Sequence, residues 1–195
     1  PVYVAYILDA SSGMGSPWTA DGDSRLRAAQ IALARHCHPL GPGVSIGLRV
    51  YGHRMSALDS STCGDVEVLA PVVANQLEAL LSHLASVQAQ GLDSLAEGLR
   101  QSLGDFTFVP ERRNAVVLIS DGGDTCGGDA AQVVANQRQT GITLPVYVIG
   151  LSVVAESRIE LERVAQISGG HYFDVVQVDE LEQTLVQIAH LLSAD

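Results

Sequence analysis

Residues 114–120, with the sequence NAVVLIS, constrain the fold more than any other part of the chain. Successive positions in this run are apolar, so an extended strand here is apolar on both of its faces. That pattern is typical of parallel sheets in α/β proteins, where helices cover both sides of the strand. The run therefore predicts a central, buried, parallel strand, and Asp121-Gly122-Gly123 follow directly where it ends.

The rest of the chain alternates between short apolar runs and amphipathic stretches. Further strands are predicted at residues 2–8, 44–51, 65–71, 144–150 and 171–173. Apolar residues recur at helical spacing in 74–87 and 94–103, which predicts helices there. The other intervening stretches also read as helices, at 24–35, 130–139, 156–166 and 181–192. A polar, Gly/Ser-rich connection favours an antiparallel hairpin between the second and third strands. The alternation predicts a single domain over residues 1–195, a Rossmann-like α/β fold with an open, mostly parallel sheet between helices.

The charge of the chain limits its partners. The formal net charge is −11, and all 11 basic residues are arginine. Such an acidic domain disfavours nucleic acid and anionic membrane surfaces, whereas cations and proteins with basic surfaces are favoured. No apolar run approaches the roughly 20 residues that a membrane-spanning helix needs. We therefore expect no nucleic-acid partner and no direct membrane insertion by this segment.

Three predicted loops carry an aspartate to the same edge of the sheet. Asp9 ends the first strand, Asp121 ends the strand 114–120, and Asp93 lies at the start of a helix. Ligands of open α/β sheets bind beyond the carboxyl ends of the central strands. If the two strands are neighbours, the three carboxylates repel one another and favour a cation. Their hard oxygen atoms, with the hydroxyl groups of Ser11 and Ser12, suit Mg²⁺, Mn²⁺ or Ca²⁺.

Several segments in a fixed order carry a resemblance to a known family. They are DASSGM (9–14), SRLRAAQIAL (24–33), GLRVYGHR (47–54), GLDSLAEGL (91–99), VVLISDGGDTCGGD (116–129) and ISGGHYFD (167–174). Over its whole length the chain resembles the von Willebrand factor A domain with its metal-ion-dependent adhesion site, and it is most similar to bacterial members. The resemblance implies a six-stranded sheet with one antiparallel edge strand. Because the chain opens directly in a core strand, we expect it to be a domain excised from a longer protein.

The family's metal site can be carried over residue by residue. Asp9, Ser11 and Asp121 match its Asp-x-Ser-x-Ser and third-loop aspartate, while Asp93 stands where the family has threonine and Gly13 where it has the second serine. The resemblance implies a divalent cation, Mg²⁺ first and Mn²⁺ or Ca²⁺ as alternatives, held by Asp9, Ser11, Asp93 and Asp121. An anionic ligand at position 93 would hold the ion more tightly and make it a poorer acceptor for a partner's acidic side chain. The alternative is a degenerate site without an ion, in which Asp93 caps its helix and Asp121 accepts backbone N–H bonds.

A second group of residues on the same edge is predicted to contact a partner protein. These candidates are Ser12, Gly13, Trp18, Arg54, Gly122 and Asp124. Arg54 has two interpretations: a counter-ion for the acidic cluster, or structural hydrogen bonding within the hairpin loop, which we favour. Trp18 is either an exposed partner contact or a locally packed aromatic side chain.

The three cysteines bear on the cellular compartment. Cys63 precedes the third strand and Cys126 follows the strand 114–120, so both are expected at the carboxyl edge. A disulfide between them would tie the hairpin loop over the site and would indicate an oxidising environment. The alternative is two ordinary thiols, and Cys37 is expected to be a buried free thiol. We favour an extracytoplasmic location (secreted, periplasmic or surface-anchored), with the cytoplasm as the alternative.

Three functions fit these observations. The first is a non-enzymatic protein-binding or adhesion module, and the second is a scaffold subunit of a larger machine with a degenerate metal site. The third is a metal-dependent hydrolase, because acidic residues at strand ends suit metal-assisted hydrolysis. However, the chain has no GxxxxGK[ST] loop, no GxSxG motif and no lysine to neutralise a phosphate group. We therefore predict a binding module and not an enzyme.

Overall fold

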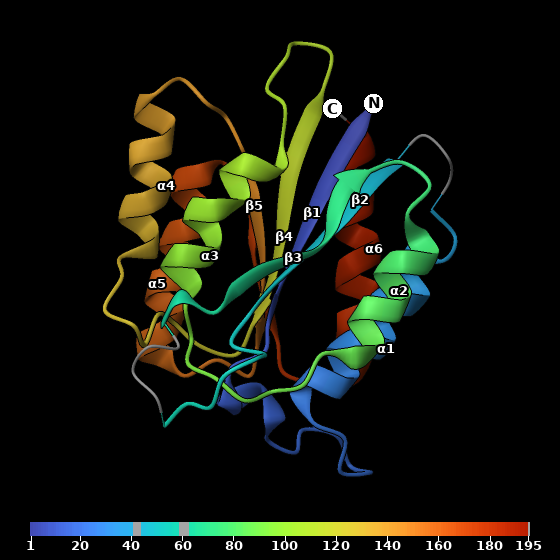
Figure 1. Ribbon diagram of the computed structural model, residues 1–195, viewed down its shortest axis with the longest axis vertical. Coiled ribbons are helices and arrows are strands. Elements are labelled where there is room, and N and C mark those ends of the chain that lie inside the picture. The colour runs from blue at the N-terminus through green and yellow to red at the C-terminus, as the bar shows by residue number, and fades with distance from the viewer. Residues whose placement is uncertain (41–43, 59–62, 195) are drawn as a thin grey trace.

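The predicted central strand forms the middle of an open sheet. In the computed structural model, which describes residues 1–40, 44–58 and 63–194, β4 (Arg113–Ser120) is buried from Asn114 to its end. The described strands form a six-stranded sheet in the order β3-β2-β1-β4-β5-β6 (Figure 1). The other strands are β1 (Val2–Asp9), β2 (Val44–Tyr51), β3 (Val66–Val73), β5 (Val146–Leu151) and β6 (Tyr172–Val175). Neighbouring strands are parallel except at the β2–β3 edge pair, which is antiparallel as predicted.

Helices cover both faces of this sheet. Figure 1 shows α1 (Arg25–Cys37), α2 (Leu77–Ser86) and α6 (Val178–Ala194) on one face. The opposite face carries α3 (Leu95–Ser102), α4 (Ala130–Gln139) and α5 (Ala155–Ser168). Because side chains alternate along a strand, β1 sends Tyr6 and Leu8 into the first layer and Ile7 into the second. Two cores of aliphatic side chains result, and the predicted α/β fold class is confirmed.

Local chemistry explains where the elements begin and end. Ser24 caps α1 by accepting a hydrogen bond from the Arg27 N–H at 3.1 Å. The helix predicted from residue 74 instead begins at Leu77, because Asn75 has a φ of +59° that is incompatible with a helix. The strand predicted to end at Pro71 continues to Val73, since β3 lies at the edge, where a proline is tolerated.

The strand order reverses between β1 and β4, which makes their carboxyl ends the topological switch point of the sheet. The chain passes from β1 to β2 on one side, whereas β4 pairs with β1 on the other side. In such sheets the loops diverge at this point and leave room for a ligand. The register pairs Leu8 with Ile119 and Asp9 with Tyr51, so these three strands end at nearly the same level. No helix among the described residues is long and apolar enough to span a membrane.

Candidate functional site

Three carboxyl groups, two of them buried, meet where β1 and β4 end. Asp9 is the last residue of β1 and is fully buried, and Asp93 is 4% exposed just before α3. The side chain of Asp121, one residue beyond β4, is 14% exposed. The charges of Asp9 and Asp121 both raise the pKa of Asp93, which shows that the three groups interact. The predicted convergence of the three loops is therefore observed.

Asp9 is fixed by hydrogen bonds to both of its carboxylate oxygens. Its Oδ1 accepts the Ser11 N–H at 2.7 Å, and its Oδ2 accepts the Ser120 hydroxyl at 2.7 Å. The hydroxyl of Tyr51 lies 3.3 Å from Ser120 Oγ and extends this network. Burial raises the pKa of Asp9, while these hydrogen bonds act in the opposite direction. The network holds the carboxyl group in one orientation at the floor of the site.

Asp93 is the least satisfied group of the three. Its Oδ1 is buried and has no hydrogen-bond partner. Burial, followed by the charges of Asp9 and Asp121, raises its pKa well above the ordinary value. Its Oδ2 lies against Gly122, where an added Cβ would come within 3.1 Å of this oxygen. No hydrogen bond from the Asp93 side chain to the first turn of α3 is found, so the structure gives no support to the helix-cap alternative.

Asp121 completes the cluster. Burial and then the charge of Asp9 raise its pKa to about 6, and the guanidinium charge of Arg25 opposes this rise. Arg25 Nη1 lies 3.9 Å from Asp121 Oδ2, at the outer limit of an ion pair. An added Cβ at Gly13 would lie 2.7 Å from Asp121 Oδ2. The glycine at the family's second serine position thus leaves room for the Asp121 carboxylate.

The donor set fits a hard divalent cation. Carboxylate and hydroxyl oxygens are its preferred ligands. A cation would give the unpartnered Asp93 Oδ1 a partner and would reduce the repulsion among the three carboxylates. Among the described residues, no group of three or more His, Cys, Asp or Glu side chains is already arranged to hold a metal ion. An ion here would therefore also need ligands of another kind, such as the buried Ser11 and water.

The predicted partner-contact residues fall into two sets. Ser12 is exposed beside the cluster, and Gly13 and Gly122 pack against Asp121 and Asp93. Asp124 instead serves the protein itself, because its carboxylate accepts the backbone N–H groups of Ala96, Cys126 and Gly128.

Trp18 and Arg54 also make internal contacts. The indole N–H of Trp18 donates to Ser152 Oγ at 2.8 Å, and the ring packs against the core. Arg54 binds the buried Asp65, with its Nε 2.7 Å from Asp65 Oδ1, which supports the structural interpretation of this arginine. The cation that approaches the acidic cluster is Arg25, which the sequence analysis did not single out.

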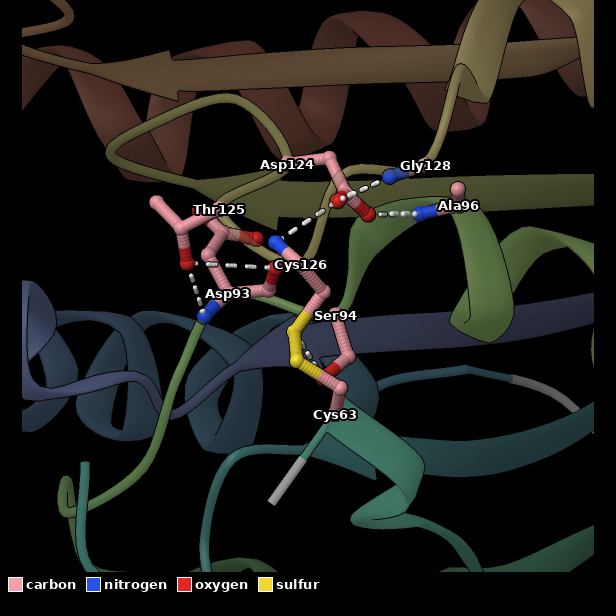
Figure 2. Close-up of a disulfide and its surroundings, with 8 residues drawn as sticks. All are labelled: Cys63, Asp93, Ser94, Ala96, Asp124, Thr125, Cys126 and Gly128. Carbon is pink, nitrogen blue, oxygen red and sulfur yellow. Dashed lines mark hydrogen bonds between the residues drawn. A yellow bond between two sulfur atoms is a disulfide. The ribbon is translucent and has the colours of Figure 1, made fainter. Parts of the chain in front are cut away.

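The predicted disulfide is present. Cys63 and Cys126 are bonded at 2.04 Å and join two loops of the carboxyl edge (Figure 2). Cys37 is a buried free thiol, as predicted, and burial raises its pKa to about 12. Tyr51 and Ser120 were missed as members of the site. Their position at the last residue of a strand that ends at this edge was the available signal.

Comparisons with known proteins identify relatives by sequence. No protein-family model matches the chain. YwmC of Bacillus subtilis is 26% identical over 197 residues, which covers 99% of this chain and 85% of YwmC. YwmD of the same organism is 28% identical over 187 residues, with 92% and 81% covered.

Solved structures with the same architecture define the fold. A von Willebrand factor type A protein from Catenulispora acidiphila matches with a TM-score of 0.74 at 17% identity, over 96% of this chain and 41% of that one. The pilus adhesin SpaC from Lactobacillus rhamnosus GG matches with a TM-score of 0.76 at 15% identity, over 98% and 30%. The proximal thread matrix protein 1 of the mussel byssus, with zinc in its metal-ion-dependent adhesion site, matches with a TM-score of 0.67 at 14% identity, over 97% and 45%. The fold of this chain is that of a von Willebrand factor A domain.

Proposed function

We propose that this domain is a non-enzymatic binding module that recognises another protein through its carboxyl-edge loops, around a divalent cation. Asp9, Ser11, Asp93 and Asp121 would hold the ion, and Mg²⁺ is the first candidate, with Mn²⁺ and Ca²⁺ as alternatives. The observation that carries this proposal is the buried, unpartnered Oδ1 of Asp93 within three mutually repelling carboxyl groups. Burying such a group without a partner is costly, and a cation supplies the missing interaction.

The ion would serve as a contact point for the partner. A bound cation supplies an electron-accepting site for an oxygen atom, and a partner's acidic side chain is the ligand expected from the family resemblance. Three carboxylates outweigh the two charges of the ion, so this acidic ligand would bind less strongly than at a site with threonine in place of Asp93. A zinc-occupied site in the byssus protein supports ion binding in this fold.

Apolar side chains at the same edge add a surface for a protein partner. Leu58 is 98% exposed, and the neighbouring Ala57 N–H donates to Gln90 O, next to the site. On the other side of the edge, Val154 follows β5 and is 61% exposed. These single side chains would add apolar contacts with a partner beside the ion.

The disulfide supports an extracytoplasmic location. Disulfides form and persist in secreted, periplasmic and surface proteins and are rare in the cytosol. The structural neighbours include a pilus adhesin and a byssus matrix protein. We infer that this domain acts outside the cytoplasm, as an adhesion module.

Thermal unfolding tests the ion site. The wild type is unfolded in EDTA and then with Mg²⁺, Mn²⁺, Ca²⁺ or Zn²⁺, beside Asp121→Asn and a control, Asp21→Asn, which changes an exposed loop residue. An ion at about 100 times its dissociation constant stabilises the fold by roughly 2.7 kcal/mol. We expect the midpoint to rise with at least one ion in the wild type and the control, and to stay constant in Asp121→Asn. Constant midpoints in all three proteins would refute the ion site and leave a metal-free scaffold as the function.

A further inference from the structure

A turn of the neighbouring loop forms hydrogen bonds with the backbone of Asp93. Residues 124–128, which we call the clamp turn, lie against the segment that leads into α3 (Figure 2). The Thr125 N–H donates to the Asp93 carbonyl at 3.0 Å, and Thr125 Oγ1 accepts the Asp93 N–H at 2.9 Å. Both backbone groups of Asp93 are thus bound by one residue that lies 32 positions further along the chain.

The residues on either side of Thr125 contact the first residues of α3 and its N-cap. Asp124 Oδ2 accepts the Ala96 N–H at 2.8 Å, in the first turn of the helix. Ser94, the N-cap residue of α3, makes no side-chain capping bond, so Asp124 supplies the cap from the other loop. Ser94 Oγ instead lies 3.5 Å from Cys126 Sγ. Three consecutive residues of the turn therefore contact the segment from Asp93 to Ala96.

The clamp turn is itself firmly anchored. Asp124 Oδ1 accepts the N–H groups of Cys126 and Gly128, each at 2.8 Å. The Asp124 N–H donates to Glu160 Oε2 at 3.0 Å, and Cys126 is bonded to Cys63. Because the turn begins three residues after Asp121, the same loop carries Asp121 and binds the backbone of Asp93.

Asp93 needs such a restraint. Its carboxyl group is buried beside those of Asp9 and Asp121, which repel it, and its Oδ1 has no donor. Without a hold on its backbone, the segment would relax by turning the side chain towards solvent. Thr125 is exposed and lies outside the core, so its contacts with Asp93 are what it contributes here.

We propose that Thr125 is a positioning residue of the ion site: it fixes the backbone of Asp93, and this keeps the Asp93 carboxylate among the ligands. The inference rests on the proposed function, because it concerns the same ion. Partners that orient metal ligands commonly change metal affinity by about 10-fold to 100-fold when they are removed. Thr125 thereby sets the spacing of two ligands, Asp93 and Asp121, that come from different loops.

Titration calorimetry of the chelator-stripped protein with MnCl₂ tests this role. Thr125→Val keeps the shape of the side chain and removes the oxygen that accepts the Asp93 N–H. We expect its Mn²⁺ affinity to fall about 10-fold or more. Thr125→Ser restores the oxygen, so its loss of affinity should be smaller than about 10-fold. Thr140→Val is the matched control, because the Thr140 hydroxyl bonds to Gln137 at the end of α4, and its affinity should not change.

Amide hydrogen exchange supplies a readout that does not depend on the ion. In EDTA, the Asp93 N–H should exchange faster in Thr125→Val than in the wild type and slow again in Thr125→Ser. Thr125→Ala replaces the valine variant, with the same expectations, if valine prevents folding. Equal Mn²⁺ affinities for the wild type and Thr125→Val would overturn the positioning role and leave the ion site standing. A wild type that binds no Mn²⁺ would refute the ion site, and the positioning role with it.

Discussion

At the scale of single residues, the proposed ion site sets stability against binding. Ionised Asp121 lies beside Asp9, with Arg25 as a distant counter-charge at 3.9 Å. The folded protein therefore gains little from this carboxylate unless a cation is bound. Functional groups of this kind often reduce the stability of the fold that carries them.

Asp121→Asn should accordingly stabilise the ion-free protein at neutral pH. The pKa of Asp121 is about 6 in the folded state against an ordinary value of 3.8, so the stability tied to its proton is present below pH 3.8 and is lost as the pH rises through 6. We expect the variant to exceed the wild type by on the order of 1 kcal/mol at pH 7.5. This advantage should vanish near pH 4, where the wild-type carboxyl group is protonated. Chemical unfolding in EDTA across this pH range measures the difference, and a variant less stable than the wild type at pH 7.5 would contradict it.

The residues of the candidate site that the sequence did not reveal are those whose contact partners are distant in sequence. Asp9, Asp93 and Asp121 were predicted because each stands at the end of a recognisable element or in a motif. Arg25 and Thr125 were not predicted as site residues, because nothing in their local sequence reports contacts with Asp121 and Asp93. Such contacts depend on how two loops pack, and local patterns carry no information about that packing.

At the scale of elements, the N-terminus of α3 is capped by a residue from another loop. The carboxylate of Asp124 accepts N–H groups from Ala96 of α3 and from Cys126 and Gly128 of its own turn. Helix caps are usually local, and the local sequence offers Asp93 for this role. The structure shows a cap supplied from 28 residues away.

Asp124→Ala should therefore destabilise the protein more than the loss of a local cap. We expect a loss of about 2 kcal/mol for Asp124→Ala, at the upper end of values for cap removal, and about 1 kcal/mol for Asp129→Ala. Asp129 is the matched control, because its side chain caps only α4, at the Gln132 N–H. Urea unfolding at neutral pH in EDTA compares the two variants. A loss for Asp124→Ala no larger than that for Asp129→Ala would show that the cap and the turn contribute little.

The elements themselves followed from sequence where periodicity was strong. The continuous apolar run of β4 and the helical spacing of α1 and α4 gave the correct type of element. The start of α2 was wrong because an isolated positive φ at Asn75 is a backbone property that no apolar pattern reports. The extension of β3 past Pro71 depended on knowing that this strand lies at the edge.

At the scale of the whole molecule, topology made the location of the site predictable. In an open α/β sheet the ligand site is expected where the strand order reverses. Because β1 and β4 are neighbours at this point, their last residues bring Asp9 and Asp121 close together. The start of β1 and the end of α6 lie at the opposite end of the molecule from the carboxyl edge (Figure 1). The identity of the proposed ion and partner depends on fine geometry and surface shape, which topology does not determine.

The disulfide acts at this same scale, because it joins the β2–β3 connection to the loop that carries the clamp turn. It closes a sequence separation of 63 residues, and a bridge of that span typically contributes roughly 2–4 kcal/mol by restricting the unfolded chain. Cys63→Ala/Cys126→Ala should lose this amount in urea unfolding, and the wild type reduced with dithiothreitol should match the double variant. Cys37→Ala is the control for thiol loss, since Cys37 is outside the bridge. Equal stabilities of the oxidised and reduced wild type would show that the bridge does not hold the two loops together in solution.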